Sequence, residues 1–351
     1  MKKTALVVCP GRGTYNKAEL GYISNNCISN SVADKALLAQ FDAVRSAAGL
    51  ATVSELDQQP VFSRSTHLKA ENAAALIFAA GVADYRSINS EQFEVVAVTG
   101  NSMGWYTALG CAGVLAPDNG MQLVSDMAQL TADGAGAQFI YPVIDDSWQT
   151  DTQRCALVQQ QLALHKDQLF KSIMYGGYAV LAGSEAAVKA AMAALPPCDD
   201  RFPLLLPGHG AFHTGFMQAA SDKALALWPA ARFNQPQLPL IDGRGQIWPN
   251  FGSDLAALQR YTLQHQVCQT YHFSKALQVA VKEFAPEHII LLGPGAGLGG
   301  AVAQSLIEIN WQGMGSKQDF IAAQQNELPY VLSMGLAEQR LLLGNVANKR
   351  C

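Results

Sequence analysis

The stretch around Ser102 constrains the fold of this chain more than any other part of its sequence. Residues 93–100 read FEVVAVTG, and this apolar, β-branched run predicts a buried strand. Residues 100–104, G-N-S-M-G, follow at once, and residues 103–115 have the composition of a helix. A strand, a tight turn and a helix are the context in which G-x-S-x-G presents a nucleophile, so Ser102 is a candidate nucleophile.

The remaining pattern of the N-terminal part also predicts alternating strands and helices. Residues 4–9, TALVVC, form a short apolar run that a Pro-Gly pair ends, which predicts a buried strand and a Gly-rich loop carrying Arg12. Helical spacing and strong helix formers predict helices at residues 33–48 and 68–81. A chain of 351 residues is long enough for one large domain with an insertion, or for two domains.

From about residue 136 the pattern changes to short alternating elements that continue to about residue 206. Their order is close to β-α-β-β-α-β, a small α+β unit inserted in a larger domain. Beyond it, residues 214–228 predict an amphipathic helix, and residues 288–309 predict a strand, a Gly/Pro turn and a helix. The tail from about residue 312 predicts only a helical extension.

Composition narrows the classes of partner and cofactor. The formal net charge is −4 and the pI is about 6.0, so no basic field favours nucleic acid. No apolar stretch approaches the ~18 residues of a membrane span, and the first apolar run is too short for a signal peptide. The seven cysteines include no C-x-x-C pair. We therefore expect a cytoplasmic protein with no metal, no cofactor, and neither nucleic acid nor membrane as a partner.

A serine nucleophile needs a base and a stabilised oxyanion. Of the seven histidines, His213 lies at a predicted loop-to-helix junction just after the insertion. His209 lies four residues earlier in the same loop and is the rival. Spacing alone does not choose between them.

Four motifs together resemble the malonyl-CoA:acyl-carrier-protein transacylase family, which includes the acyltransferase domains of polyketide synthases. They are, in order, C-P-G-R-G at 9–13, G-N-S-M-G at 100–104, A-F-H-T-G-F-M at 211–217 and G-P-G-A-G-L-G-G at 293–300. The likeness runs from residue 4 to about residue 305. Four motifs in register are far more specific than any one of them.

This resemblance implies an α/β fold in which a large α/β-hydrolase-like domain carries an inserted ferredoxin-like small α+β domain. On this basis we expect the large domain to comprise residues 1–135 and 205–351, with the helical extension from about 312. The small domain then comprises residues 136–204. The active site is expected in the cleft between the two domains.

The resemblance also implies a reaction and a set of residues. The substrates would be acyl-CoA and an acyl carrier protein with phosphopantetheine, and the acyl group would pass through an ester on Ser102. His213 would be the base. Gln266, matched by spacing alone because the family's Pro-Val here reads Thr-Tyr, would supply the carbonyl that orients it. The backbone amides of Met103 and Arg12 would form the oxyanion hole, and backbone donors tolerate changes of side chain.

The sequence departs from the family where the acyl group would bind. Met127 stands where the family has the arginine that pairs with the malonyl carboxylate, and Asn101 and Trp105 replace the family's His and Glu around the serine. A small-domain pair that is polar in the family reads Met174 and Tyr178. These losses of polarity favour an apolar pocket, formed with Met127 and Trp105, for an acyl group without a free carboxylate.

Two other readings of the substitutions stay open. Arg12 replaces a family glutamine, and its guanidinium is able to bind a malonyl carboxylate from the opposite side. Phe212 resembles the phenylalanine that narrows the pocket of malonyl-selecting domains, which favours a small acyl group. In the last reading the protein is a thioester hydrolase or an inactive binding relative.

A hydrolase with a complete triad needs an acid between the serine and the histidine. The candidates are exposed or in loops by their sequence context: Asp145, Asp146, Glu185 and Asp199. A carboxylate bonded to His213 would support this class of enzyme. A non-catalytic interaction protein would instead show no acylation of Ser102.

Overall fold

The computed structural model describes residues 1–27, 31–132 and 134–344. Within them, six strands form the sheet of the large domain, and the strands are parallel except for β8. In sheet order they are β11 (Val331–Ser333), β10 (His288–Leu291), β1 (Lys3–Cys9), β2 (Phe93–Gly100), β7 (Leu240–Ile241) and β8 (Ile247–Trp248). The two central strands, β1 and β2, are the predicted apolar runs, and both end in the core beside the G-N-S-M-G turn.

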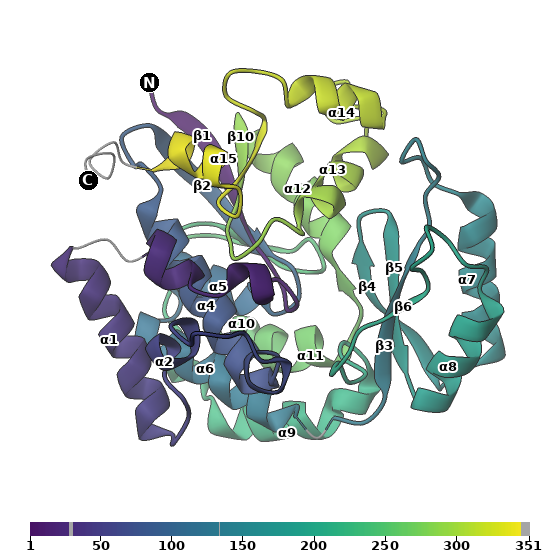
Figure 1. Cartoon of the computed structure of the whole chain (residues 1–351), viewed down its shortest axis with the longest axis horizontal. Coiled ribbons are helices and arrows are strands. Elements are labelled where there is room, and N and C mark those ends of the chain that lie inside the picture. Colours follow the sequence, from purple (N-terminus) through teal and green to yellow (C-terminus); the bar gives the residue numbers. More distant parts are fainter. Residues whose placement is uncertain (28–30, 133, 345–351) are drawn as a thin grey trace.

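Helices cover the large sheet on both sides. In Figure 1, α4, α5 and α6 gather on one side of the strands, and α12 and α13 lie on the other. The helices of this part are α1 (Val32–Ala47), α2 (Val53–Asp57), α3 (Arg64–His67), α4 (Ala70–Ser87), α5 (Gly104–Cys111), α6 (Pro117–Leu130), α9 (Gln218–Leu227), α10 (Leu255–Arg260), α11 (Gln266–Cys268), α12 (Phe273–Phe284), α13 (Gly299–Glu308), α14 (Lys317–Ala323) and α15 (Ala337–Leu343). Short 3-10 and π turns lie at Lys17–Glu19, Ile23–Cys27, Gly215–Met217, Ala230–Arg232 and Tyr261–His265.

A second sheet of five strands stands beside the first, on the right in Figure 1. Its order is β6 (Leu204–Leu205), β3 (Ala137–Pro142), β5 (Tyr178–Gly183), β4 (Leu169–Tyr175) and β9 (Tyr271–His272), with α7 (Thr152–Leu164) and α8 (Glu185–Ala194) on its outer face. The elements from β3 to β6 follow one another as β-α-β-β-α-β. Because successive residues of a strand point to opposite faces, Phe139 and Leu181 pack under the two helices while Ile140 and Val180 face the large domain.

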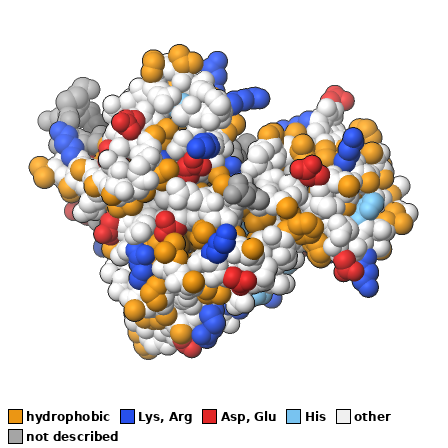
Figure 2. Space-filling model, turned by 90° about the horizontal axis from the view of Figure 1, so that it is seen from below, with side chains coloured by type: hydrophobic (Ala, Val, Ile, Leu, Met, Phe, Trp, Pro, Cys, Tyr) orange, Lys and Arg blue, Asp and Glu red, His pale blue; other side chains and the backbone are white. Residues whose placement is uncertain are grey.

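The predicted α/β fold with a small ferredoxin-like unit is confirmed. Seen from below, the molecule has a larger and a smaller lobe, and hydrophobic side chains lie along their junction (Figure 2). The division at residues 136–204 stays a prediction. One strand of the small sheet, β9, comes from outside this range.

The predicted helical tail is wrong in one respect. Residues 331–333 form β11, which extends the large sheet next to β10. The pattern hid this strand because β11 has only three residues and is flanked by helices α14 and α15. Residues 345–351 of the predicted extension lie outside the described residues.

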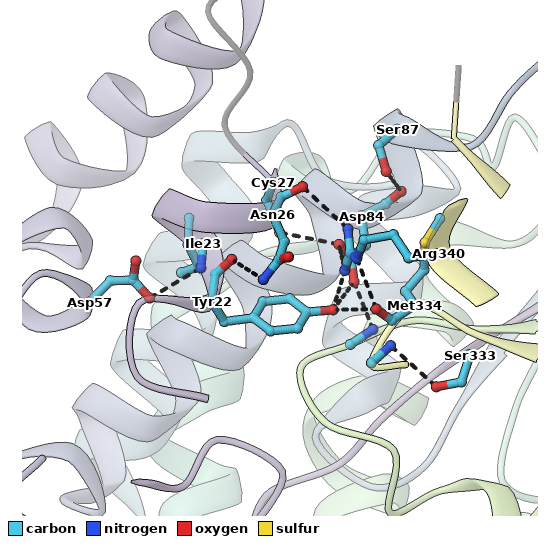
Figure 3. Close-up of polar contacts among 12 residues, drawn as sticks. Tyr22, Ile23, Asn26, Cys27, Asp57, Asp84, Ser87, Ser333, Met334 and Arg340 are labelled. Atoms are coloured by element: carbon cyan, nitrogen blue, oxygen red, sulfur yellow. Dashed lines mark hydrogen bonds and ion pairs between the residues drawn. The ribbon is translucent and has the colours of Figure 1, made fainter. Parts of the chain in front are cut away.

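A buried ion pair ties the tail to the N-terminal part of the chain (Figure 3). The Asp84 carboxylate, near the end of α4, is fully buried and lies 2.7 Å from Nη2 of Arg340 on α15. The Tyr22 hydroxyl and the Gly293 amide each donate to the same carboxylate at 2.8 Å. The guanidinium also donates to the carbonyl of Met334. These contacts satisfy a charge that is costly to bury alone.

We predict that Arg340→Ala lowers the free energy of unfolding by about 3–5 kcal/mol, because the buried Asp84 carboxylate loses its cation. Urea unfolding followed by circular dichroism measures this change. Arg260→Ala removes an exposed arginine of α10 and serves as the control, with an expected change within about 0.5 kcal/mol. An equal, small effect of both variants would contradict the importance of the pair.

Candidate active site

Ser102 lies on a strained turn between β2 and α5. Its φ is +54°, in the left-handed region that residues with a side chain rarely adopt. Gly104 lets the helix begin close to β1, since a Cβ at this position would approach the Cys9 carbonyl oxygen to 2.3 Å. The sharp turn lifts the serine hydroxyl out of the sheet and places the first turn of α5 behind it.

The imidazole of His213 contacts the serine directly. Ser102 Oγ and His213 Nε2 are 2.7 Å apart. His213 is buried and also has a left-handed backbone, with φ of +58°. Of the two histidines in this loop, the structure brings His213 to Ser102, whereas His209 Nδ1 lies 2.8 Å from Gln138 Oε1.

The backbone carbonyl of Gln266 contacts the other nitrogen of the His213 ring. Nδ1 lies 2.5 Å from this oxygen. A carbonyl only accepts hydrogen bonds, so Nδ1 must carry the proton and Nε2 is left to accept from the serine hydroxyl. Gln266 begins α11, directly after the π turn Tyr261–His265, and this irregular segment aims its carbonyl at the ring.

The side chain of Gln266 also contacts the turn at residues 100–104, which carries Ser102. Its Nε2 donates to the Ser102 carbonyl at 3.0 Å, and its Oε1 accepts from the Tyr106 hydroxyl at 3.2 Å. One residue therefore contacts both the imidazole of His213 and the backbone of Ser102. Sequence reasoning missed Tyr106, although its place on α5, four residues after Ser102, puts it on the face of the helix that turns toward the site.

No carboxylate shares this arrangement among the described residues. Burial lowers the pKa of His213 to about 4, and the hydrogen bond to the Gln266 carbonyl opposes the shift only in part. Burial likewise lowers the pKa of His209 to about 3. Asp145, an acid proposed for a hydrolase triad, accepts from amides of its own loop, and Glu185 begins α8 on the far side of the small sheet.

Two backbone amides near Ser102 have no hydrogen-bond acceptor among the described residues. Neither the amide of Met103 nor that of Arg12 donates to another residue in the part of the chain that the structure describes. The loop with Arg12 lies directly against the turn that carries Ser102: a Cβ on Gly11 would be only 2.7 Å from the Asn101 carbonyl oxygen. Both residues line the same cavity as Ser102.

A cavity of about 220 Å³ opens beside Ser102 between the two sheets. Its wall combines residues of α6, the small sheet and the nucleophile turn, and most of them are apolar: Met103, Val124, Met127, Ala128, Ile140, Ile173, Tyr175, Val180, Phe212 and Val267. Asn101, Gln138, His209 and Gln266 add polar groups. Met127 is buried and belongs to this wall.

The Arg12 side chain lies at the junction of this cavity with a second, outer one that runs along α8 and β6. Its Nη2 donates to the Leu68 carbonyl at 3.3 Å, and its guanidinium carbon lies 6.0 Å from the centre of the Phe212 ring. No carboxylate of the described residues forms an ion pair with it. Burial lowers the pKa of Arg12, while the charge of Glu71 acts in the opposite direction.

Two sequence expectations about this wall are wrong. Trp105 does not line the cavity: it is fully buried behind the turn, where its Nε1 donates to Thr262 Oγ1 at 3.0 Å. The small-domain residues that face the cavity on β4 are Ile173 and Tyr175, and neither Met174 nor Tyr178 is part of the wall. The strand alternation turns Met174 to the other face.

Within the residues described, no group of histidine, cysteine or acidic side chains is arranged to hold a metal ion. No helix among them is both long and apolar enough to cross a membrane.

Comparison with known proteins supports the resemblance found in the sequence. No family model matches the chain. The malonyl CoA-acyl carrier protein transacylase of Escherichia coli K12 is 26% identical over 231 residues, which are 64% of this chain and 71% of that protein. The transacylase of the same name from Synechocystis sp. is 24% identical over 232 residues, 66% of this chain and 74% of that protein.

Solved structures share the fold over nearly the whole chain. The crystal structure of the Synechocystis malonyl-CoA:ACP transacylase matches with a TM-score of 0.74 at 20% identity, covering 98% of this chain and all of that one. A malonyl-transacylase solved in complex with a type II polyketide synthase acyl-carrier protein matches with a TM-score of 0.67 at 20% identity, covering 87% and 93%. In sequence the chain is similar to malonyl CoA-acyl carrier protein transacylases, and it shares the fold of their solved structures.

Proposed function

We propose that this protein transfers an acyl group from acyl-CoA to the phosphopantetheine thiol of an acyl carrier protein through an ester on Ser102. The observation that carries the proposal is the 2.7 Å contact between Ser102 Oγ and a His213 ring whose Nδ1 is held by a carbonyl. This pair has the geometry that general-base activation of a serine requires. The family's reaction supports the same chemistry.

In the first half-reaction, Ser102 Oγ attacks the thioester carbonyl while its proton passes to His213 Nε2. The free amides of Met103 and Arg12 are the donors available to the oxyanion. When the tetrahedral intermediate collapses, the C–S bond breaks and the imidazolium returns its proton to the departing coenzyme A thiolate. Ser102 is then esterified and His213 is neutral again.

In the second half-reaction, the thiol of the carrier protein attacks the Ser102 ester. His213 Nε2 takes the thiol proton and gives it to Ser102 Oγ as the C–O bond breaks. The Gln266 carbonyl keeps the same ring nitrogen available in both directions, and it stabilises the transient imidazolium without adding a full negative charge.

The wall of the cavity favours an acyl group without a free carboxylate. Met127 is the residue at the family's arginine position, and Val124 on the same helix adds to the apolar surface. A carboxylate buried there without a cation costs several kcal/mol, which corresponds to roughly a thousandfold or more in affinity. Met adapts to irregular apolar shapes and suits chains of different form.

Malonyl transfer is the second candidate, and Arg12 supports it. Its guanidinium lies in the cavity wall with one hydrogen bond to a carbonyl and without a carboxylate partner among the described residues. Arginine presents several donors in a planar fork that matches a carboxylate. Phe212, beside this guanidinium, narrows the space and favours a short acyl group.

Incubation with single acyl-CoAs tests the proposal. We expect acetyl-, butyryl- or octanoyl-CoA to add its acyl mass to the intact protein, and we expect Ser102→Ala to show no such addition. Adding holo acyl carrier protein should then move the acyl group to the carrier. Intact-protein mass spectrometry measures both steps.

Each other outcome of this experiment would indicate a different function. Rapid release of free acid without a carrier would indicate a thioester hydrolase. A protein that stays unmodified with every acyl-CoA would be a binding relative without activity. Loading by malonyl-CoA alone would reject the uncharged acyl group and favour Arg12 as its partner.

Substitutions of single cavity residues distinguish an uncharged acyl group from a malonyl group. We predict that Met127→Arg increases malonyl loading at least tenfold relative to acetyl loading, because it places a cation in the apolar wall. Gln129→Arg adds the same charge at an exposed position of the same helix and serves as the control. If Arg12→Ala abolishes malonyl loading by the natural protein but spares acetyl loading, Arg12 is the carboxylate partner instead.

The pH dependence tests the state of His213. A general base acts in its neutral form, and burial lowers the pKa of His213 to about 4 from the usual value near 6.5. We therefore predict that kcat/KM for acyl loading changes little from pH 7.5 to about 5.5 and falls only as the pH approaches about 4. A decline centred at pH 6.5 or higher would contradict a desolvated, neutral imidazole.

A further inference from the structure

We infer that Tyr271 is a positioning residue: it fixes the position of the turn at residues 100–104, which carries Ser102, relative to the His213 ring. This role rests on the proposed function, because it concerns the reactivity of Ser102. Tyr271 is absent from the cavity wall, so it acts through its neighbours rather than on the substrate. Its position also differs from the family, which has a Pro-Val pair where this chain has Thr270 and Tyr271.

The first contact is with the backbone that leads into the turn. The Tyr271 hydroxyl donates to the Gly100 carbonyl at 2.5 Å. Gly100 ends β2, two residues before Ser102, and its carbonyl lies where the chain leaves the sheet for the left-handed conformation of the serine. A strained conformation persists only where its surroundings hold it, and this bond is one such restraint.

The second contact is with the base. The centre of the Tyr271 ring lies 5.5 Å from that of His213, with the two planes inclined at 52°. Tyr271 is itself buried, and a Cβ on Gly243 would meet its ring at 2.7 Å, so the ring has little room to move. The tyrosine thus borders the imidazole on one side while the Gln266 carbonyl fixes Nδ1.

The third contact joins the two sheets. Tyr271 belongs to β9, which pairs in parallel with β4 of the small sheet through Ile173 and Tyr271. Its hydroxyl, by contrast, bonds to β2 of the large sheet. One side chain therefore spans the junction of the sheets directly behind the reacting pair, and Ile173, its partner in the register, lines the acyl cavity.

The consequence is a specific effect on reactivity. A shift of the turn by a fraction of an ångström lengthens the contact between Ser102 Oγ and His213 Nε2, which general-base catalysis needs at hydrogen-bond distance. Loss of the hydroxyl should therefore slow the attack by Ser102 without changing how acyl-CoA binds. A merely structural tyrosine would lower stability and leave the reactivity of the folded protein unchanged.

Tyr271→Phe tests this inference, because it removes the hydroxyl and keeps the ring. One probe is a fluorophosphonate: Ser102 Oγ bonds to phosphorus, fluoride leaves, and His213 accepts the serine proton. The other is acetyl-CoA. We expect the first-order rate of Ser102 modification at saturating reagent to fall about tenfold with each probe, while the half-saturating concentration of acetyl-CoA stays within twofold.

Tyr141→Phe is the matched control. The Tyr141 side chain is also buried and also donates to a backbone carbonyl, that of Pro196 at 3.0 Å, but it packs under the helices of the small sheet. Loss of the Tyr141 hydroxyl should lower the melting temperature about as much as Tyr271→Phe does. The rate of Ser102 modification should stay within twofold of that of the natural protein. Tyr271→Leu, which also removes the ring beside His213, should be slower than Tyr271→Phe.

The outcomes separate this inference from the proposed function. Equal rates for the natural protein and Tyr271→Phe would overturn the positioning role alone. If Tyr141→Phe also lowers the rate of Ser102 modification tenfold, the effect of Tyr271→Phe is one of stability and the positioning role is rejected. If Ser102 of the natural protein reacts with neither probe nor with any other acyl-CoA, the proposed function fails and the inference fails with it.

Discussion

The hydrogen bond from His213 Nδ1 to the Gln266 carbonyl is the interaction on which the site depends. It fixes the ring, sets the tautomer and leaves Nε2 facing Ser102 at 2.7 Å. A carboxylate in this place would raise the pKa of the imidazole, whereas a carbonyl opposes the effect of burial only in part. The result is a buried neutral imidazole whose Nε2 is placed to accept the proton of the Ser102 hydroxyl.

The two sheets explain why such a bond forms between residues so far apart in the sequence. Ser102 comes from the end of β2, His213 from the segment that follows β6, and Gln266 from the irregular segment before β9. They meet where the sheets face each other, and the cavity beside Ser102 lies at the same junction. Most residues of its wall are apolar, and among the described residues that line it Arg12 contributes the one charged side chain.

Much of this was predictable from local sequence. The strand at 93–100 and the turn after it follow from composition and two glycines, and the contact of Ser102 with His213 agrees with the motif that carries the histidine. Trp105 was misplaced because the pattern of a short helix does not tell which face meets the core. The carbonyl of Gln266 acts at long range, and only the family resemblance pointed to His213 as its partner. The partner of the Tyr271 hydroxyl is also distant in the sequence, and it is revealed only by the fold.

The tautomer of His213 tests the account most directly. Nitrogen-15 NMR of the histidine rings at pH 7, with His213 identified by comparison with His213→Asn, reports which ring nitrogen carries the proton. We predict a neutral ring with the proton on Nδ1 and an unprotonated Nε2 facing the serine. A proton on Nε2 with a bare Nδ1, or an imidazolium at this pH, would contradict it.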